Sequence, residues 1–304
     1  MRLLILGAGG IGGYYGGRLA EAGADVTFLV RPARAEKLAA QGLVLTSQYG
    51  DVRMPIRLVT RADRAFDAVL LSCKAYDLSS AIEAVAPAVG PDTVVLPLLN
   101  GLRHLQTLDD RFGAEKVLGG LCHIGVTLGP QGEIRHLDHL HRLTLGPRVP
   151  AQEAVCRRLH AALEKGRYDL VYSADILASM WEKYVRLASY AGMTCLMRAP
   201  IGAILQAEDG EALIRALLAE CLAVSTAEGY PPEAASLADT EAMLLRQGSP
   251  GKASMLRDIE RGGPTEGAHI LGDMLARARA FGLETPLLRV ANAHLQAYEA
   301  QRTA

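Results

Sequence analysis

The chain has 304 residues, half of them apolar, with 32 Lys and Arg against 33 Asp and Glu. This length exceeds one ordinary compact core, so two domains are expected. The near-zero net charge gives no electrostatic reason to expect binding to nucleic acid or to an anionic membrane. Apolar runs are too short to span a membrane, no signal-peptide pattern is visible, and the five scattered cysteines form no C-x-x-C pair. These features predict a cytoplasmic protein without a disulfide framework or a zinc site.

The first 31 residues combine two apolar runs with a glycine turn. Leu3–Leu6 leads into G-A-G-G-I-G, which is followed by a helix-like segment and a second apolar run at 26–30. Strand, G-x-G-x-x-G turn, helix and strand is the order of a dinucleotide-binding unit, whose helix N-terminus faces the phosphates. A glycine turn that binds no nucleotide is the alternative. The predicted cofactor-binding turn consists of Gly7, Gly9, Gly10, Ile11 and Gly12.

The second apolar run ends at Arg31, where an NAD-selective site usually carries Asp or Glu. Arg34 follows, and no carboxylate occurs before Glu36. A guanidinium at this corner favours a 2′-phosphate, although a solvated arginine at a helix start is the alternative. Arg31 therefore indicates NADP(H) as the cofactor.

Residues up to about 172 alternate β-rich and helical stretches. Expected helices lie at about 79–89, 102–111 and 151–165. A hairpin is expected between 43–46 and 52–59, and two antiparallel edge strands at 132–137 and 142–145. The remaining expected strands are 67–72, 93–99, 117–125 and 169–172.

From residue 174 the pattern becomes helical, with runs separated by Gly and Pro. Gly282 is a typical C-terminal stop of the fifth run. The sequence thus predicts an α/β protein: a Rossmann domain with a doubly wound sheet at 1–172, then an all-helical substrate domain at 173–304, with a cleft between them. The expected helices are 174–197, 208–228, 237–247, 254–261, 264–281 and 286–302.

Two charged residues of the helical part are candidates for chemistry. Lys183 follows Trp181 in a helix that is apolar on most faces, so it either extends to solvent or serves a purpose at the cleft. Glu266 is expected in the first turn of a helix that Pro264 begins, where the helix dipole stabilises a carboxylate. An ordinary N-terminal glutamate is the alternative for Glu266.

Lys74 and Asn100 each follow a buried strand, so both are expected at the carboxyl edge of the sheet, where open α/β folds bind ligands. Asn100-Gly101 is also a common turn dipeptide. His136, His139 and His141 with Asp138 could suggest a metal, but alternation along a strand points residue 136 away from 139 and 141. A polar sheet edge is the preferred interpretation, and no metal site is expected.

Taken together, the motifs resemble those of the ketopantoate reductase (2-dehydropantoate 2-reductase) family and span almost the whole chain. The resemblance implies a Rossmann domain followed by a helical domain, and NADPH-dependent reduction of a 2-oxo acid such as 2-dehydropantoate, the pantoate-forming step of pantothenate biosynthesis. The motifs are Gly7–Gly12, Arg31, Cys73-Lys74-Ala75, Leu99-Asn100-Gly101, Trp181-Glu182-Lys183, Ser254–Ile259 and Pro264-Thr265-Glu266.

The resemblance also implies roles for single residues. Lys183 becomes the catalytic lysine, since an ammonium can stabilise a developing alkoxide and deliver its proton. Glu266 would hold the lysine or bind a substrate hydroxyl or the cofactor, and Ser254 would bind the substrate carboxylate. Asn100 would lie between nicotinamide and substrate, Lys74 would border the cofactor, and Arg31 would contact the 2′-phosphate.

One departure from the family concerns substrate recognition. The family places Asn four and eight residues after the lysine and three before the serine, where this chain has Leu187, Ala191 and Gly251. Tyr190 and Thr194 on the same helix could partly replace these amides, and Tyr190 is a candidate substrate contact. Unpaired polar groups of a substrate are costly to bury, so a different 2-oxo acid is conceivable.

Two other functions remain open: an NADP-dependent dehydrogenase of a different hydroxy acid, and a non-catalytic module that senses NADP(H). Retention of Lys183 with Glu266 argues against the sensor, which needs neither residue. The expected partner is a small 2-oxo acid. Helical domains of this kind often pair, so a homodimer is the candidate assembly.

Overall fold

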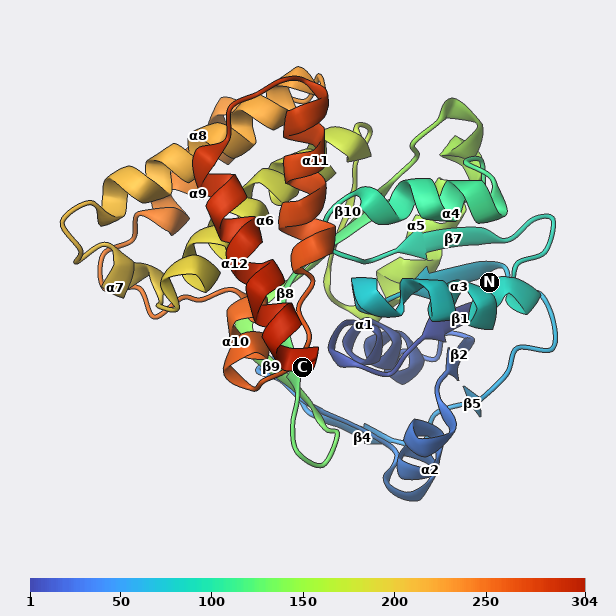
Figure 1. Ribbon diagram of the computed structural model, residues 1–304. Coiled ribbons are helices and arrows are strands. Elements are labelled where there is room, and N and C mark those ends of the chain that lie inside the picture. The colour runs from blue at the N-terminus through green and yellow to red at the C-terminus, as the bar shows by residue number, and fades with distance from the viewer. Residues whose placement is uncertain (304) are drawn as a thin grey trace. The chain divides into compact units, whose positions relative to one another are not determined.

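The computed structural model describes residues 1–303 (Figure 1). The chain divides into two compact units. We call Met1–Leu99 with His104–Ile176 the sheet unit, and Asn100–Arg103 with the chain from Leu177 onward the helical unit. The short segment Asn100–Arg103 thus belongs to the helical unit although its neighbours in sequence belong to the sheet unit.

A parallel sheet forms the first half of the sheet unit, in the order β5-β2-β1-β6-β7, and its strands are largely buried except for the half-buried edge strand β5. These strands are mainly apolar because helices cover both faces of such a sheet. The chain adds β2 and then β5 on one side of β1, and afterwards β6 and β7 on the other side. This reversal of strand order beside β1 is typical of a doubly wound fold and confirms the predicted fold class. The strands are β1 (Leu3–Leu6), β2 (Val26–Leu29), β5 (Leu58–Val59), β6 (Ala68–Leu71) and β7 (Val94–Pro97), and the helices are α1 (Gly10–Glu21), α2 (Pro32–Gln41), α3 (Leu78–Val85) and α4 (Arg103–Phe112).

A second sheet, in the order β10-β9-β3-β4 with β8 paired to β9, completes this unit. The hairpin predicted between 43–46 and 52–59 is confirmed for β3 and β4, but the expected strand at 52–59 divides into β4 and β5. Pro55, which has no N–H to donate, follows β4, and β5 pairs with β2 in the other sheet. The elements are β3 (Leu43–Thr46), β4 (Val52–Met54), β8 (Gly119–Leu128), β9 (Ile134–Gly146), α5 (Glu153–Leu163) and β10 (Asp169–Tyr172).

The prediction of two antiparallel edge strands at 132–137 and 142–145 was wrong. These residues form the single strand β9, which pairs antiparallel with β8 and parallel with β3 and β10. Partners on both sides keep β9 away from the sheet edge. The intervening polar residues, which resemble a turn, are accommodated by a bulge in the pairing of β9 with β8 between Ile124 and Val126.

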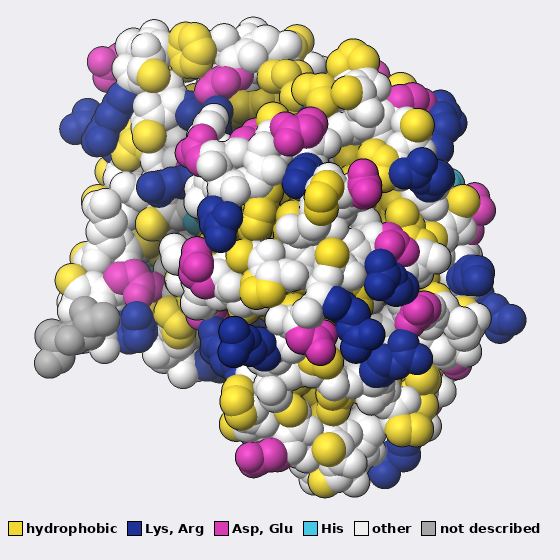
Figure 2. Space-filling model, turned by 90° about the vertical axis from the view of Figure 1, so that its right-hand side faces the viewer, with side chains coloured by type: hydrophobic (Ala, Val, Ile, Leu, Met, Phe, Trp, Pro, Cys, Tyr) yellow, Lys and Arg dark blue, Asp and Glu magenta, His cyan; other side chains and the backbone are white. Residues whose placement is uncertain are grey.

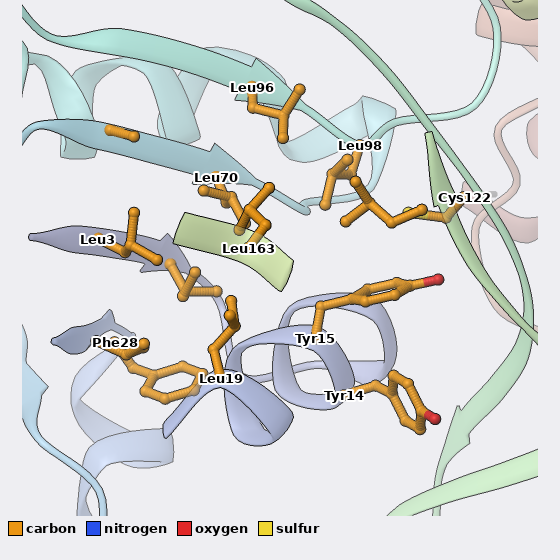
Figure 3. Close-up of a cluster of buried hydrophobic side chains, with 14 of the residues drawn as sticks. Leu3, Tyr14, Tyr15, Leu19, Phe28, Leu70, Leu96, Leu98, Cys122 and Leu163 are labelled. Atoms are coloured by element: carbon orange, nitrogen blue, oxygen red, sulfur yellow. The ribbon is translucent and has the colours of Figure 1, made fainter. Parts of the chain in front are cut away.

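The core of the sheet unit is mainly aliphatic, as the scarcity of Phe and Trp requires. Figure 3 shows the side chains of the strands facing those of α1, which contributes Tyr14 and Tyr15. Burying each large apolar side chain of this kind stabilises a fold by about 1.5–3 kcal/mol. Representative members of the cluster are Leu3, Phe28, Leu70, Leu96 and Leu163.

Up to residue 303, the helical unit contains helices and no strand, as predicted, and α8 packs against α11 and α12. The four-residue helix α7 was missed, because it is too short to give a periodic apolar pattern. The helices are α6 (Ile176–Met197), α7 (Ile201–Ile204), α8 (Gly210–Ala227), α9 (Ala234–Leu244), α10 (Ser254–Glu260), a π-helical turn (Ala268–Gly272), α11 (Asp273–Ala280) and α12 (Pro286–Thr303).

The prediction that Pro264 begins a helix was wrong, because helical structure starts at Gly267. Thr265 is tied to α12 instead: its N–H and its hydroxyl both donate to Glu299 Oε1, at 2.6 and 2.7 Å. Glu266 therefore precedes the first turn. Its carbonyl oxygen accepts the first helical bonds, from the N–H groups of His269 and Ile270, at 3.0 and 2.9 Å.

None of the helices found in residues 1–303 is long and apolar enough to cross a membrane. On the face shown in Figure 2, basic and acidic side chains are interspersed rather than gathered by sign. This arrangement agrees with the balanced composition of the chain.

Candidate active site

The glycine turn has the geometry that a pyrophosphate requires. Gly7 has φ +87°, and its N–H donates to the Leu29 carbonyl at 2.9 Å, which fixes the turn after β1. A Cβ on Gly12 would overlap the Gly7 carbonyl oxygen, so only glycine lets α1 start this close to the strand. A Cβ on Gly9 would meet nothing within 4 Å, which leaves the backbone before α1 open to a ligand. The N–H groups of the first turn of α1 can therefore bind phosphate.

Arg31 follows β2 and precedes Pro32, the first residue of α2. Its side chain is 73% exposed, and its Nη2 lies 2.8 Å from Oδ1 of Asp77. Asp77 closes the 3₁₀ turn Ala75–Asp77 after β6. Sequence reasoning missed Asp77, because nothing in the pattern pairs two residues 46 positions apart.

Arg34 has a structural role that separates it from Arg31. Its Nη2 donates to the carbonyl oxygens of Ala8 and Gly132, at 2.9 and 2.8 Å. Burial lowers the pKa of Arg34. Arg34 therefore fastens the glycine turn to the loop between β8 and β9, which leaves Arg31 as the guanidinium at the end of β2.

Lys74 lies at the same edge of the sheet as the glycine turn. It precedes the 3₁₀ turn after β6 and is half-buried. Nearby, the Ser72 hydroxyl donates to the Leu6 carbonyl at 2.8 Å and so joins the carboxyl ends of β6 and β1. The glycine turn, Arg31 and Lys74 thus surround the point where the strand order reverses, the usual ligand site of such sheets.

Lys183 is half-buried on α6, and its Nζ donates a hydrogen bond to Asn100 Oδ1 at 3.0 Å. Its neighbours hold the helix in place. The Trp181 ring stacks on Tyr230, with centroids 6.0 Å apart, and the Arg277 guanidinium lies over it. The ammonium of Lys183 therefore extends from a closely packed part of the helical unit.

The other side of Asn100 is held by His269, a residue that the sequence analysis missed. The His269 ring is 8% exposed and hydrogen-bonds the Asn100 backbone. Burial lowers the pKa of His269, while the Glu266 carboxylate nearby opposes this shift. Glu266 is itself 6% exposed. The structure thus brings Lys183, Asn100, His269 and Glu266 into one connected group.

Tyr190 and Ser254 form a second group, which begins two helical turns, about 10 Å, beyond Lys183 along α6. A Cβ on Gly251 would lie 2.8 Å from the Tyr190 hydroxyl oxygen, so Tyr190 packs on the segment before α10. Burial raises the pKa of Tyr190, and Arg257 opposes the shift. Ser254 is the first residue of α10 and is exposed.

Thr194 is not available to replace the missing amides. Its hydroxyl donates to the Tyr190 carbonyl at 2.7 Å and accepts from the Ala253 N–H at 3.4 Å. Ala191 is fully buried, so its side chain faces the interior of the helical unit. On the Lys183 face, the half-buried side chains beyond the lysine are Leu187 and Tyr190.

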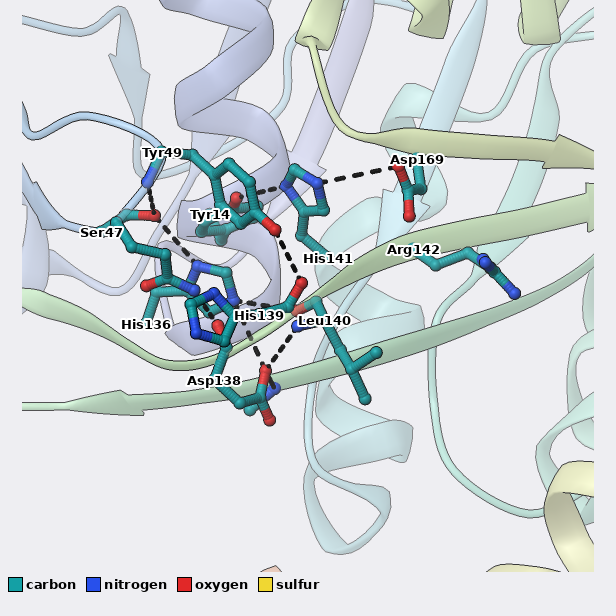
Figure 4. Close-up of polar contacts among 12 residues, drawn as sticks. Tyr14, Ser47, Tyr49, His136, Asp138, His139, Leu140, His141, Arg142 and Asp169 are labelled. Carbon is teal, nitrogen blue, oxygen red and sulfur yellow. Dashed lines mark hydrogen bonds and ion pairs between the residues drawn. The ribbon is translucent and has the colours of Figure 1, made fainter. Parts of the chain in front are cut away.

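The histidines of β9 differ from the expectation. His136 and His141 are both buried, and their ring centroids lie 6.2 Å apart (Figure 4). The bulge explains why both rings are buried. His141 pairs with Ile124 and His136 with Val126, and the register shift between these two pairs breaks the alternation of side-chain faces along β9. The expected polar sheet edge is therefore wrong for these two residues.

Both buried rings have protein partners. His136 contacts the Ser47 hydroxyl through Nδ1 at 2.9 Å and the Leu140 carbonyl through Nε2 at 2.8 Å. His141 Nδ1 lies 3.0 Å from the Tyr14 hydroxyl. Across the described part of the chain, no three His, Cys, Asp or Glu side chains gather as a metal site would require.

Comparison with known proteins assigns the family. The family model of ketopantoate reductase PanE/ApbA matches residues 3–150, and that of its C-terminal part matches residues 175–299. The chain is 39% identical to the uncharacterized oxidoreductase YkpB of Bacillus subtilis, over 99% of this chain and all of that protein.

Solved structures agree. The 2-dehydropantoate 2-reductase of Geobacter metallireducens matches with TM-score 0.90 and 30% identity, over 98% of this chain and 99% of that one. A D-mandelate dehydrogenase bound to NADH and anilino(oxo)acetate shares the fold over both full chains, with TM-score 0.89 and 19% identity. The chain therefore belongs to the ketopantoate reductase PanE/ApbA family of oxidoreductases.

Proposed function

We propose that this chain is an NADPH-dependent reductase that converts a 2-oxo acid to a 2-hydroxy acid, with Lys183 as the general acid. The observation that carries the proposal is the 3.0 Å hydrogen bond from Lys183 Nζ to Asn100 Oδ1 in a chain of this family. Reduction of 2-dehydropantoate is the reaction for which the Geobacter relative is named. The Bacillus subtilis relative is named as an oxidoreductase, which agrees with this class of reaction.

A bound nicotinamide dinucleotide would supply the hydride that adds to the carbonyl carbon of the substrate. The part of Lys183 is to stabilise the negative charge that develops on the carbonyl oxygen and to transfer one proton to it. Asn100 supports this role because its amide oxygen accepts one ammonium proton and fixes the direction of the other two. Lys183 is left neutral and regains its proton from solvent.

NADPH is the proposed cofactor because the glycine turn fits a pyrophosphate and Arg31 stands where a 2′-phosphate would lie. Gly9, Gly10, Ile11 and Gly12 would contact the phosphates through their backbone, and Lys74 would border the site. The Asp77 carboxylate beside Arg31 weakens the preference for NADPH over NADH, since this carboxylate would repel a 2′-phosphate.

The substrate that we propose has an apolar side chain. Beyond Lys183, the half-buried side chains on the lysine face of α6 are Leu187 and Tyr190, and the Thr194 hydroxyl is bonded within the protein. A hydroxylated substrate placed against this face would have one polar partner, the Tyr190 hydroxyl. Ser254 remains the proposed contact of the substrate carboxylate.

Oxidation of NADPH, followed by absorbance with a panel of 2-oxo acids, tests the proposal. The panel contains 2-dehydropantoate, pyruvate and phenylglyoxylate, and the reverse reaction is measured with the matching hydroxy acids. We expect reduction of at least one 2-oxo acid. Turnover in the oxidative direction alone would favour a dehydrogenase of another hydroxy acid, and tight NADPH binding without any turnover would favour a sensor.

A further inference from the structure

We propose that His269 is a positioning residue, which holds the Asn100–Gly101 turn so that Asn100 stays on the Lys183 ammonium. This role rests on the proposed function, in which Lys183 is the general acid. His269 would not touch substrate. It would act through Asn100, the residue to which Lys183 is bonded.

The first support is the close fit of His269 against the turn. Gly101 has φ +74°, a conformation that favours glycine, and a Cβ there would lie 3.2 Å from His269 Cδ2. The ring also hydrogen-bonds the Asn100 backbone, and this bond favours the protonated ring. The ring nitrogen is therefore the donor and the Asn100 carbonyl oxygen the acceptor. One side chain thus fixes both residues of the turn.

The second support is the π-helical turn Ala268–Gly272, in which His269 lies. A π-turn adds one residue to a helical turn and so redirects the side chains within it. The Tyr184 hydroxyl donates to the Ile270 carbonyl oxygen of this turn at 2.7 Å and lies 3.0 Å from Asp273 Oδ2, and the same carbonyl also accepts the Asp273 N–H.

Tyr184 follows Lys183 directly on α6 and is fully buried. The π-turn therefore contacts the lysine helix through Tyr184 and the lysine's acceptor through His269. These two attachments, made by the adjacent residues His269 and Ile270 of one turn, fix Asn100 relative to Lys183. The distance between Lys183 Nζ and Asn100 Oδ1 consequently depends on the His269 contact.

The third support is the charge environment of the ring. Burial, the largest effect, lowers the pKa of His269, and Arg103 acts in the same direction. Glu266 and Asp273 act in the opposite direction. At neutral pH the buried ring is therefore a neutral hydrogen-bond donor, which holds Asn100 without adding a second positive charge beside the ammonium.

The test compares His269→Leu, which removes the donor, with His269→Gln, whose amide can still donate. We expect His269→Leu to lower kcat about 3- to 10-fold, the effect of one lost hydrogen bond, with the Kd for NADPH unchanged. The alkaline limb of the pH profile of kcat should move to lower pH in His269→Leu, because a displaced Asn100 no longer stabilises the protonated form of Lys183. His269→Gln should restore most of kcat and the original limb.

A second readout does not need turnover. The reactivity of Lys183 toward an amine-acylating reagent, mapped by mass spectrometry against pH, should rise at lower pH in His269→Leu than in wild type. Gly101→Ala, which strains the backbone of the turn at φ +74° and also brings a methyl group 3.2 Å from His269 Cδ2, should disturb Asn100 and so shift both measurements in the same direction as His269→Leu.

The outcomes separate the two proposals. If wild type reduces no 2-oxo acid, the proposed function fails, and the labelling profile still decides the role of His269. If wild type is active but His269→Leu keeps both its alkaline limb and its labelling profile, His269 has no positioning role. Equal losses in His269→Leu and His269→Gln would also overturn the proposal.

Discussion

Arg31 and Asp77 are joined by a 2.8 Å ion pair between the end of β2 and the turn after β6. Because Arg31 is the residue proposed to bind the 2′-phosphate of NADPH, a carboxylate already bonded to it competes with the phosphate. Exposed pairs of this kind contribute only about 0–1 kcal/mol, so the competition is weak but measurable.

Asp77→Asn is expected to tighten NADPH binding about 2- to 5-fold, since it removes both the competing partner and a repelling charge. NADH binding should change little, because NADH carries no 2′-phosphate. Fluorescence titration with each cofactor measures the Kd for NADPH and the Kd for NADH. Arg31→Ala is the matched variant and should weaken NADPH at least about 10-fold, again without a comparable effect on NADH. Equal changes in the Kd of NADPH and of NADH in either variant would contradict the proposal that Arg31 binds the 2′-phosphate.

Lys183→Ala should lower turnover at least about 100-fold while the Kd for NADPH stays close to that of wild type. The reason is that the variant loses the proton donor and the charge that stabilises the developing alkoxide, but no residue of the glycine turn. Steady-state kinetics and cofactor titration measure the two effects separately. Lys165→Ala, an exposed lysine of the sheet unit, is the control and should retain wild-type turnover. Retained turnover in Lys183→Ala would exclude the lysine as general acid.

Local patterns were sufficient to predict the fold. The glycine turn lies between two mainly apolar strands, and nearly continuous apolar runs mark the parallel sheet, because strands covered on both faces carry few polar residues. The change to long helical runs after residue 174 predicted the helical part. These signals are readable because each depends on residues close in sequence.

What the sequence did not show depends on pairing between distant residues. The polar stretch of β9 resembles a turn, and only its partners β3, β8 and β10 make it one strand. His269 lies in an apolar helical stretch, and nothing in its local pattern indicates that its ring meets Asn100. Strand pairing and buried hydrogen bonds are set by tertiary contacts that local propensity does not encode.

His141 makes the stability of the chain sensitive to pH. Burial has the largest effect on the pKa of His141 and lowers it from the ordinary value of 6.5. The charges of His136 and Arg18 act in the same direction, and the Asp169 carboxylate opposes the shift. The folded chain therefore binds this proton less readily than the unfolded chain. The stability that the neutral ring contributes is complete above about pH 6.5 and is lost as pH falls through the lower, folded value.

Chemical denaturation at pH 7 and pH 5 checks this effect. His141→Gln, which cannot titrate, should lose less unfolding free energy between the two values than wild type does. His139→Gln, an exposed histidine on the same strand, is the control and should behave like wild type. An identical loss in wild type and His141→Gln would show that this ring does not set the pH response.

Substrate preference depends on Leu187, the half-buried apolar side chain one turn beyond Lys183 on α6. Leu187→Asn introduces an amide that can pair with a substrate hydroxyl, whereas an apolar substrate would leave this amide unpaired. The ratio of kcat/KM for 2-dehydropantoate to that for phenylglyoxylate should therefore rise about 10-fold. Leu187→Met, which keeps the face apolar, should leave the ratio near that of wild type. A ratio that responds equally to Asn and Met would mean that the polarity of this position does not select the substrate.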